Sequence, residues 1–441
     1  MSAADRPVES PGLRRGLGRF DVVALCVNSI VGAGVFALPA VLALDAGRYS
    51  LVVIFAAFAV VGCLALSLAE VSSRYDVTGG PQVYAQRTFG PLSGFTVGWL
   101  FSVSRIASYA LISQVMLDYA AALWPALAPP LPRAAAITVF TFALAAINVR
   151  GVTQGAWTGN LLTIAKLVPL GLIALAGLWY AGWNDLPSAA PREPDGLMNA
   201  MNLALFACVG FDVAAIVSGE MRNPRRDLPV SILGGLAISC LLYLLLMIAC
   251  FGILPDTAAT KLPLTEVAEH FLGSTGATLM AVAAVVSTAG GLAVQMLVSP
   301  RNIFALGEAG DLPRPVAAVH RAFRTPHVAI LIYATLSWIL AITGAFKYLL
   351  AIFVIARMLV YGSTAAAVIV LRRCEGPAPV AIPGGAIISV LALAACAALV
   401  ATQSFQAVRD VAIVLAVGFV IRAVVRWRLG TGQSGQSRSS S

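Results

Sequence analysis

The stretch NSIVGAGVFALPA, residues 28–40, lies inside the first long apolar segment of the chain and carries two glycines, Gly32 and Gly34, at its centre. Glycine destabilises a helix by about 1 kcal/mol relative to alanine, so this is the weakest point of a segment that otherwise predicts a membrane-spanning helix. In a bilayer, a helix can break only where protein or water takes up the freed backbone groups. Two interpretations follow: an unwound segment beside a binding site, or small residues that only permit close helix packing.

The composition of the whole chain is that of an integral membrane protein. Of its 441 residues, 59% are hydrophobic and 11% are charged, and the mean hydropathy is +0.88. Apolar runs recur from one end of the chain to the other without a long polar block. This pattern predicts one all-α transmembrane domain over residues 20–427, between a polar tail over 1–19 and a disordered tail over 428–441.

The apolar runs predict twelve membrane spans, because about 20 apolar residues cross the hydrocarbon core as a helix. The expected spans are 21–44, 51–73, 92–124, 133–149, 158–181, 198–219, 229–254, 275–300, 327–344, 347–371, 383–403 and 408–427.

The distribution of basic residues predicts the orientation of these spans. With the N-terminus in the cytoplasm, 20 of the 29 Lys and Arg residues fall on the inner side and six on the outer side. The positive-inside rule therefore places both termini in the cytoplasm. The net charge of +9 is explained by this topology, and no nucleic-acid partner is needed to account for it.

An unwound segment at Gly32-Ala33-Gly34 would create a site with two kinds of backbone group. The helix that begins after it would present free amide N–H groups and a positive dipole end, which favour a carboxylate. The helix that ends before it would present carbonyls near Asn28, Ser29 and Ile30, which suit an ammonium group or a cation. An amino acid carries both groups on one carbon.

A second interruption occurs at a corresponding place in the chain. Gly210 lies in the middle of the sixth expected span and is followed by Asp212, again within an apolar run. Gly32 and Gly210 each fall in the first span of a five-span set, 21–181 and 198–371, and an odd number of spans inverts the second set relative to the first. Paired interruptions of this kind indicate the central site of a secondary transporter. Residues 383–427 then form two accessory helices.

Several stretches carry a family resemblance. They are IVGAGVF at 30–36, AEVSSRYDVTGGPQVYAQRTFGP at 69–91, FACVGFDVAAIVSGEMRNPRRDLP at 206–229 and SPRNIFALGEAGDLPRP at 299–315. Together they resemble the amino acid, polyamine and organocation (APC) transporter superfamily, in particular the bacterial amino acid permeases with the LeuT-type fold. The resemblance covers the first ten spans and implies a 5+5 inverted repeat with broken helices in spans one and six.

The resemblance also implies roles for residues that match the family motifs. The amides of the glycine motif would hold the substrate carboxylate, and Phe206 would be the aromatic gate. Phe206 could also be a packing residue. The expected substrate-binding residues are Ser29, Ile30, Gly32, Ala33, Gly34, Phe206, Ala207, Cys208 and Gly210.

Lys166 is the most informative charged residue within an expected span. A lysine at this depth is costly unless it faces the interior of the helix bundle and finds a partner or loses its proton. It resembles a span-five lysine of proton-dependent relatives, which implies that it couples proton entry to transport. The alternative is a lysine that reaches the inner headgroups along its own stem.

Two arginines, Arg105 and Arg357, also lie within expected spans. Intramembrane arginines commonly pair with interior carboxylates, and we favour a structural role for both over a ligand-binding one. Asp212 could pair with one of them, act in gating or sense protons. Tyr109 and Ser287 are accessory candidates for lining the site, although hydroxyls in helices often bond their own backbone.

Other classes of membrane protein fit less well. An intramembrane enzyme would need a catalytic pair or metal ligands within the spans, and the three histidines, His270, His320 and His327, are expected in loops. A channel would show a filter sequence, which we do not find; a transporter-like receptor would bind without flux. The sequence therefore predicts a multi-pass permease of the cytoplasmic membrane for an amino acid or related amine, without cofactor or metal. Proton symport is favoured over the alternatives, which are exchange of amino acids or amines and transport of a polyamine, and sodium coupling is less expected.

Overall fold

The computed structural model describes residues 18–75, 80–151, 156–180, 195–216, 221–254 and 256–436. Within these ranges the chain is almost entirely helical. The helices are α1 (Arg19–Ile30), α2 (Gly34–Asp45), α3 (Ser50–Ser72), α4 (Pro81–Phe89), α5 (Pro91–Leu123), α6 (Pro130–Val149), α7 (Ala156–Tyr180), α8 (Gly196–Cys208), α9 (Val213–Ile216), α10 (Pro224–Ile253), α11 (Pro263–Glu308), α12 (His327–Thr343), α13 (Phe346–Glu375), α14 (Gly385–Ala401) and α15 (Phe405–Gln436).

The first expected span is interrupted at its glycines. Helix α1 ends at Ile30 and α2 begins at Gly34, and the two axes are bent by 47°. The amide of Gly32 donates to the carbonyl of Ile30 at 2.7 Å, so the chain makes a tight turn between the two helices. The helix is therefore broken at this stretch, as the unwound interpretation expects.

The sixth expected span is also interrupted. Helix α8 ends at Cys208, and the short α9 begins at Val213. Gly210 lies between them with a φ of 138°, in a region that residues with a side chain rarely adopt. Residues 217–220, the end of this expected span, lie outside the described residues.

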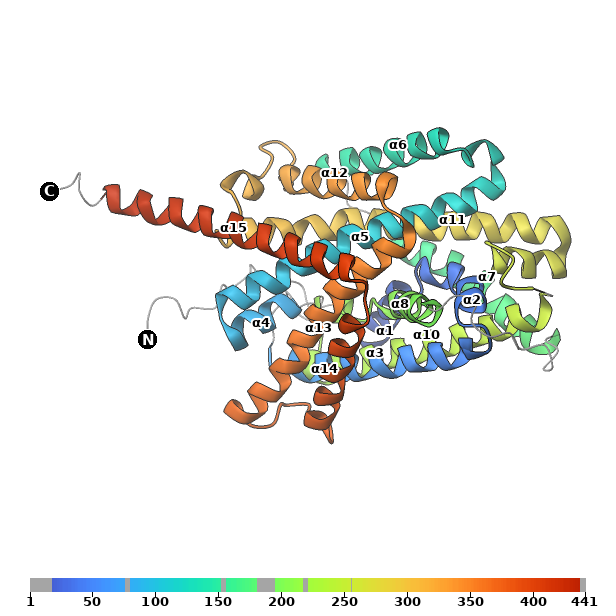
Figure 1. Ribbon diagram of the computed structural model, residues 1–441, viewed down its shortest axis with the longest axis horizontal. Coiled ribbons are helices and arrows are strands. Elements are labelled where there is room, and N and C mark those ends of the chain that lie inside the picture. The colour runs from blue at the N-terminus through green and yellow to red at the C-terminus, as the bar shows by residue number, and fades with distance from the viewer. Residues whose placement is uncertain are drawn as a thin grey trace.

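The interrupted helices occupy the middle of the bundle. In Figure 1, α1, α2 and α8 lie in the interior of the fold, and helices α3, α5, α10 and α13 run around them. Helices α6 and α12 pack together along one side, and α15 extends beyond the other helices. The least regular backbone is thus surrounded by protein, as the bilayer requires.

The described helices are those of an integral membrane protein. Seven are long and apolar enough to cross a membrane, or nine if each of two bent pairs counts as one span. The bent pairs are α1 with α2 and α14 with α15, the second bent by 109°. Two shorter apolar helices, residues 166–180 and α12, lie on further expected spans.

Some local expectations need correction. Helix α15 continues to Gln436, where the sequence predicts a disordered tail from residue 428; residues 437–441 and 1–17 lie outside the described residues. His270 lies within α11 and His327 opens α12, so of the three histidines only His320 lies in a loop. Helix α11 starts before the expected span and is broken at Gly273, which has a φ of 61°.

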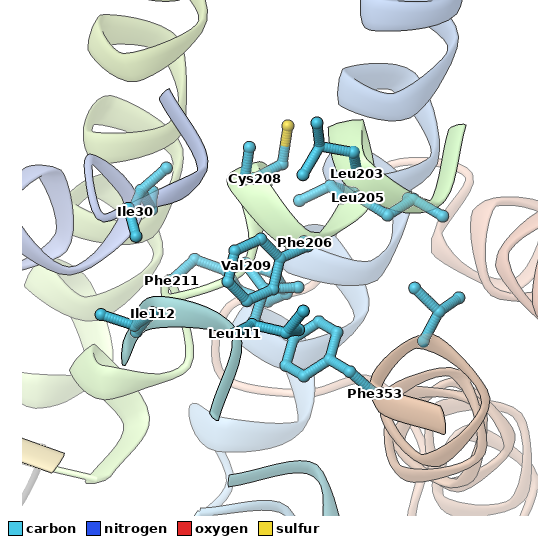
Figure 2. Close-up of a cluster of buried hydrophobic side chains, with 14 of the residues drawn as sticks. Ile30, Leu111, Ile112, Leu203, Leu205, Phe206, Cys208, Val209, Phe211 and Phe353 are labelled. Atoms are coloured by element: carbon cyan, nitrogen blue, oxygen red, sulfur yellow. The ribbon is translucent and has the colours of Figure 1, made fainter. Parts of the chain in front are cut away.

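An apolar cluster surrounds the two interruptions. Figure 2 shows Phe206 beside Val209 and Leu111, with the ring of Phe353 approaching from α13. The Phe206 and Phe353 rings meet edge to face, with centroids 5.0 Å apart. Aromatic pairs of this geometry contribute about 1 kcal/mol beyond their buried area. This cluster packs the end of α8 against α13, a continuous helix of the surrounding bundle.

Candidate binding site

The two interruptions contact each other directly, backbone against backbone. A Cβ placed on Gly34 would lie 2.6 Å from the Cα of Ala207, and one on Gly210 would lie 2.7 Å from the carbonyl carbon and oxygen of Ser29. Neither contact leaves room for a methyl group. Glycine is therefore required at both positions, once at the start of α2 and once after α8.

One tyrosine joins the two interruptions. The hydroxyl of Tyr243, on α10, lies 2.8 Å from the carbonyl oxygen of Ile30 and 2.9 Å from that of Ala207. These carbonyls belong to the ends of α1 and α8, and a single hydroxyl proton serves both. Tyr243 is fully buried. Sequence reasoning missed it, because a tyrosine in an apolar span has no distinguishing pattern.

The first turn of α2 has amides to offer a ligand. Within the described residues, no hydrogen bond involves the amide N–H groups of Ala33, Gly34 or Val35. Such groups at a helix N-terminus, together with the helix dipole, favour an anion. The amide of Gly32 is already used in the turn to Ile30, so the available donors are shifted by one residue from the expected set.

A cavity of about 160 Å³ lies at this junction. Several predicted residues line it: Ser29, Ile30, Gly32, Ala33, Gly34, Arg105, Lys166, Phe206, Gly210, Asp212, Ser287 and Arg357. The structure thus brings together residues from α1, α2, α5, α7, α8, α11 and α13. A buried cavity of similar size holds a benzene-sized molecule, so a small organic ligand is the matching class.

Three predicted residues do not line the cavity. Ala207 packs against Gly34, and Cys208 is fully buried at the end of α8. The hydroxyl of Tyr109 lies 3.3 Å from Thr141 Oγ1 on α6, and its ring contacts Tyr333 on α12. These side chains support the walls of the site rather than facing its interior.

Lys166 reaches the end of α1. Its ammonium group donates to the carbonyl oxygens of Asn28 at 2.5 Å and Val31 at 2.7 Å. Asn28 lies in the last turn of α1 and Val31 directly follows this helix, where the negative end of the helix dipole lies. Lys166 is 7% exposed, so it faces the bundle interior and does not extend to the headgroups.

The two intramembrane arginines share one carboxylate. Arg357 Nη1 donates to Asp212 Oδ2 at 2.9 Å, and Arg105 Nη2 lies 3.8 Å from the same oxygen. Both guanidinium groups stack on the ring of Phe101, at 4.5 Å and 5.0 Å from its centroid. Asp212 therefore pairs with Arg357 by a full hydrogen bond and with Arg105 only at longer range.

Polar groups on α11 complete the cavity. Ser287 Oγ is buried without a hydrogen-bond partner among the described residues, whereas Thr288 Oγ1 donates to the carbonyl of Ala284. Gln295 also lines the cavity and donates from Nε2 to Ser108 Oγ at 3.1 Å. An unpartnered buried hydroxyl is rare in a folded protein, so Ser287 is a ready partner for a polar ligand.

The comparison with known proteins agrees with what the geometry of the cavity indicates. Residues 17–422 match the family described as amino acid permease. An uncharacterized transporter of Mycobacterium tuberculosis is 29% identical over 435 residues, covering 97% of this chain and 96% of the relative. The serine/threonine exchanger SteT of Bacillus subtilis is 29% identical over 380 residues, covering 83% and 85%. The branched-chain amino acid permease BcaP of the same organism is 27% identical over 432 residues, covering 93% and 92%.

Proposed function

The chain belongs to the amino acid permease family, within the APC superfamily, and we propose that it carries its amino acid through the cavity where the two broken helices meet. The observation that carries this proposal is the run of three amides at the start of α2 that bond no described residue, beside the carbonyl ends of α1 and α8. These groups complement the two charges of an amino acid. The substrate carboxylate would accept hydrogen bonds from Ala33, Gly34 and Val35.

The substrate ammonium group would lie at the opposite, carbonyl-rich side of the cavity. Ser29 and Val209 lie at the ends of α1 and α8, where the helix dipoles favour a cation. Phe206 lines the cavity and packs on Phe353, which supports a role as the aromatic gate. A rotation of its ring would open or close the space above the substrate. Ser287 is placed to donate to a polar substrate atom.

The wider architecture that fits this site is the LeuT-type fold. We assign residues 21–181 and 198–371 to the two inverted repeats, with 383–427 as accessory helices of one transmembrane domain. The positions of the two interruptions, each in the first helix of its set, support this assignment. Twelve spans with both termini in the cytoplasm and alternating access to a central site complete the proposal.

Proton symport is the proposed mode of coupling, with Lys166 as the coupling residue. The support is geometric: a buried ammonium group bonds the carbonyls next to the cavity, so its charge state would alter the end of α1. A neutral lysine would hold these carbonyls more weakly, because it loses the charge that strengthens both hydrogen bonds. The runner-up is amino acid exchange, which the similarity to a serine/threonine exchanger favours.

A pair of glycine substitutions tests the site. Gly291 on α11 lines the cavity and Gly62 on α3 does not, and a Cβ at either position would meet no atom within 4 Å. We expect Gly291→Val to fill the cavity and abolish uptake by proteoliposomes, while Gly62→Val transports like the wild type. The ligand would first be found by a thermal-shift screen of amino acids and polyamines. Equal uptake by both variants would place the substrate elsewhere.

A further inference from the structure

The charged residues that line the cavity are unbalanced. Within the described lining, Arg105, Lys166 and Arg357 are cations and Asp212 is the acid. A zwitterionic substrate adds one charge of each sign and leaves this excess unchanged. An excess of buried positive charge inside a membrane protein is costly, so a partner is expected for it.

Two of the three cations already have close partners. Lys166 bonds two carbonyl oxygens of α1, and Arg357 bonds Asp212 at 2.9 Å. Arg105 makes no hydrogen bond through its guanidinium group to any described residue, and its distance to Asp212 Oδ2 is 3.8 Å. Its Nε is buried without a partner. The Nε of Arg357 is also without a partner, but Arg357 bonds through Nη1, whereas no guanidinium nitrogen of Arg105 makes a hydrogen bond to a described residue.

Of the two paired arginines, Arg105 has the more exposed side chain. Its side chain is 15% exposed, compared with 3% for Arg357 and 1% for Asp212. The guanidinium group lies over the ring of Phe101, 5.0 Å from its centroid, and Arg105 lines the cavity. The edge of a guanidinium group binds a carboxylate through two parallel hydrogen bonds.

We propose that Arg105 binds a second anionic group on the substrate, and that the preferred cargo is a monoamino dicarboxylate such as aspartate or glutamate. This inference rests on the proposed function, because it requires that the α-carboxylate and ammonium groups occupy the broken helices. The side-chain carboxylate then neutralises the guanidinium charge that Asp212, already hydrogen-bonded to Arg357, balances only at longer range. Arg357 and Asp212 form the adjoining wall and hold each other in place.

The experiment compares substrates of nearly the same shape that differ in the charge of the side chain. Full-length protein in proteoliposomes is assayed with glutamate against glutamine and aspartate against asparagine, in a chloride-free gluconate buffer. We expect wild-type uptake to reach half its maximum at a concentration at least about tenfold lower for the acids than for their amides. Arg105→Gln should collapse this preference, and Arg105→Lys should retain part of it. Equal or better uptake of the amides by the wild type would overturn the proposal.

A matched control excludes a general effect of losing an arginine. Arg133, on α6, pairs with Asp118 at 2.8 Å outside the cavity, and Arg133→Gln should keep the wild-type preference. An unaltered preference in Arg105→Gln would also overturn the proposal.

A second measurement, with chloride in the buffer, tests whether the anion that binds Arg105 is inorganic chloride or the substrate carboxylate. If chloride stimulates uptake of neutral amino acids and Arg105→Gln removes this stimulation, the anion at Arg105 is inorganic and the dicarboxylate proposal is wrong. We expect no chloride dependence. Failure of the proposed function gives a different result, because Gly291→Val would then transport normally. If Gly291→Val abolishes uptake but the wild type shows no preference for acids over neutral amino acids, only this inference is overturned.

Discussion

Gly210 packs against the backbone of Ser29 so closely that a Cβ on the glycine would lie 2.7 Å from the serine carbonyl. The contact joins the unwound segment after α8 to the end of α1, 181 residues apart in the chain. It coincides with a φ of 138° at Gly210, so two independent requirements select glycine there.

Substitution of the junction glycines is expected to separate folding from binding. Gly210→Ala would force a side chain into a left-handed conformation, at about 1–3 kcal/mol, and against the Ser29 backbone, so we expect a lower melting temperature and no transport. Gly32→Ala meets no atom closer than 3.8 Å and should melt like the wild type while binding substrate more weakly. Melting curves with and without substrate measure both effects. A Gly210→Ala protein of normal stability would contradict the tight contact.

The hydroxyl of Tyr243 is expected to stabilise the junction. Tyr243→Phe keeps the ring but leaves the carbonyls of Ile30 and Ala207 without their donor, so we expect a loss of about 1–3 kcal/mol. Tyr109→Phe is the matched control, because Tyr109 is equally buried but its hydroxyl makes only a 3.3 Å contact with Thr141. Unfolding in detergent measures the difference. Equal stability of the two variants would show that the shared hydroxyl contributes little.

Lys166 is expected to be required for proton-driven uptake. Lys166→Ala removes the ammonium group from the carbonyls of Asn28 and Val31, so a pH gradient should no longer drive uptake into proteoliposomes. Exchange of labelled for unlabelled substrate should persist, because it needs no net proton movement. Lys261→Ala, an exposed residue before α11, serves as control. An unchanged pH dependence in Lys166→Ala would refute the coupling assignment.

The ion pair between Glu70 and Arg372 is expected to stabilise the packing of α3 against α13 and α14. Arg372 donates to both oxygens of Glu70, at 2.5 and 2.7 Å, and also to the carbonyl of Ile382. Because Glu70 is buried, Glu70→Ala should cost about 2 kcal/mol. Glu375→Ala is the control: its side chain is 55% exposed and lies 3.4 Å from Arg74, so this pair should contribute less than about 1 kcal/mol. Chemical unfolding of the two variants compares them, and similar losses would contradict this ranking.

Glycine placement in apolar runs was the sequence signal that located the cavity. Gly32 and Gly210 fall at corresponding places in the two sets of spans, and both lie where the helices end. The resemblance to known permeases added Phe206 and Lys166, which line the same cavity. Charges within spans were also informative, since Asp212 does pair with Arg357.

Other features could not be predicted, because they depend on tertiary contacts. The role of Tyr243 arises from two carbonyls that meet only in the folded bundle. The amide of Gly32 donates to the carbonyl of Ile30 within a turn that no sequence pattern indicated. Tyr109 was expected to line the site because it is polar, yet helix rotation points its hydroxyl to Thr141. The polar composition of residues 428–436 indicated disorder, whereas α15 continues through them.

The paired contacts of Gly34 with Ala207 and of Gly210 with Ser29 constrain how the protein moves. Two points of backbone contact fix the angle between the crossing chains as well as their separation. Neither interrupted helix can then rotate alone without breaking its contact with the other. In the proposed transport cycle, the crossing would act as a common pivot, with the substrate beside it and the surrounding helices rocking around it.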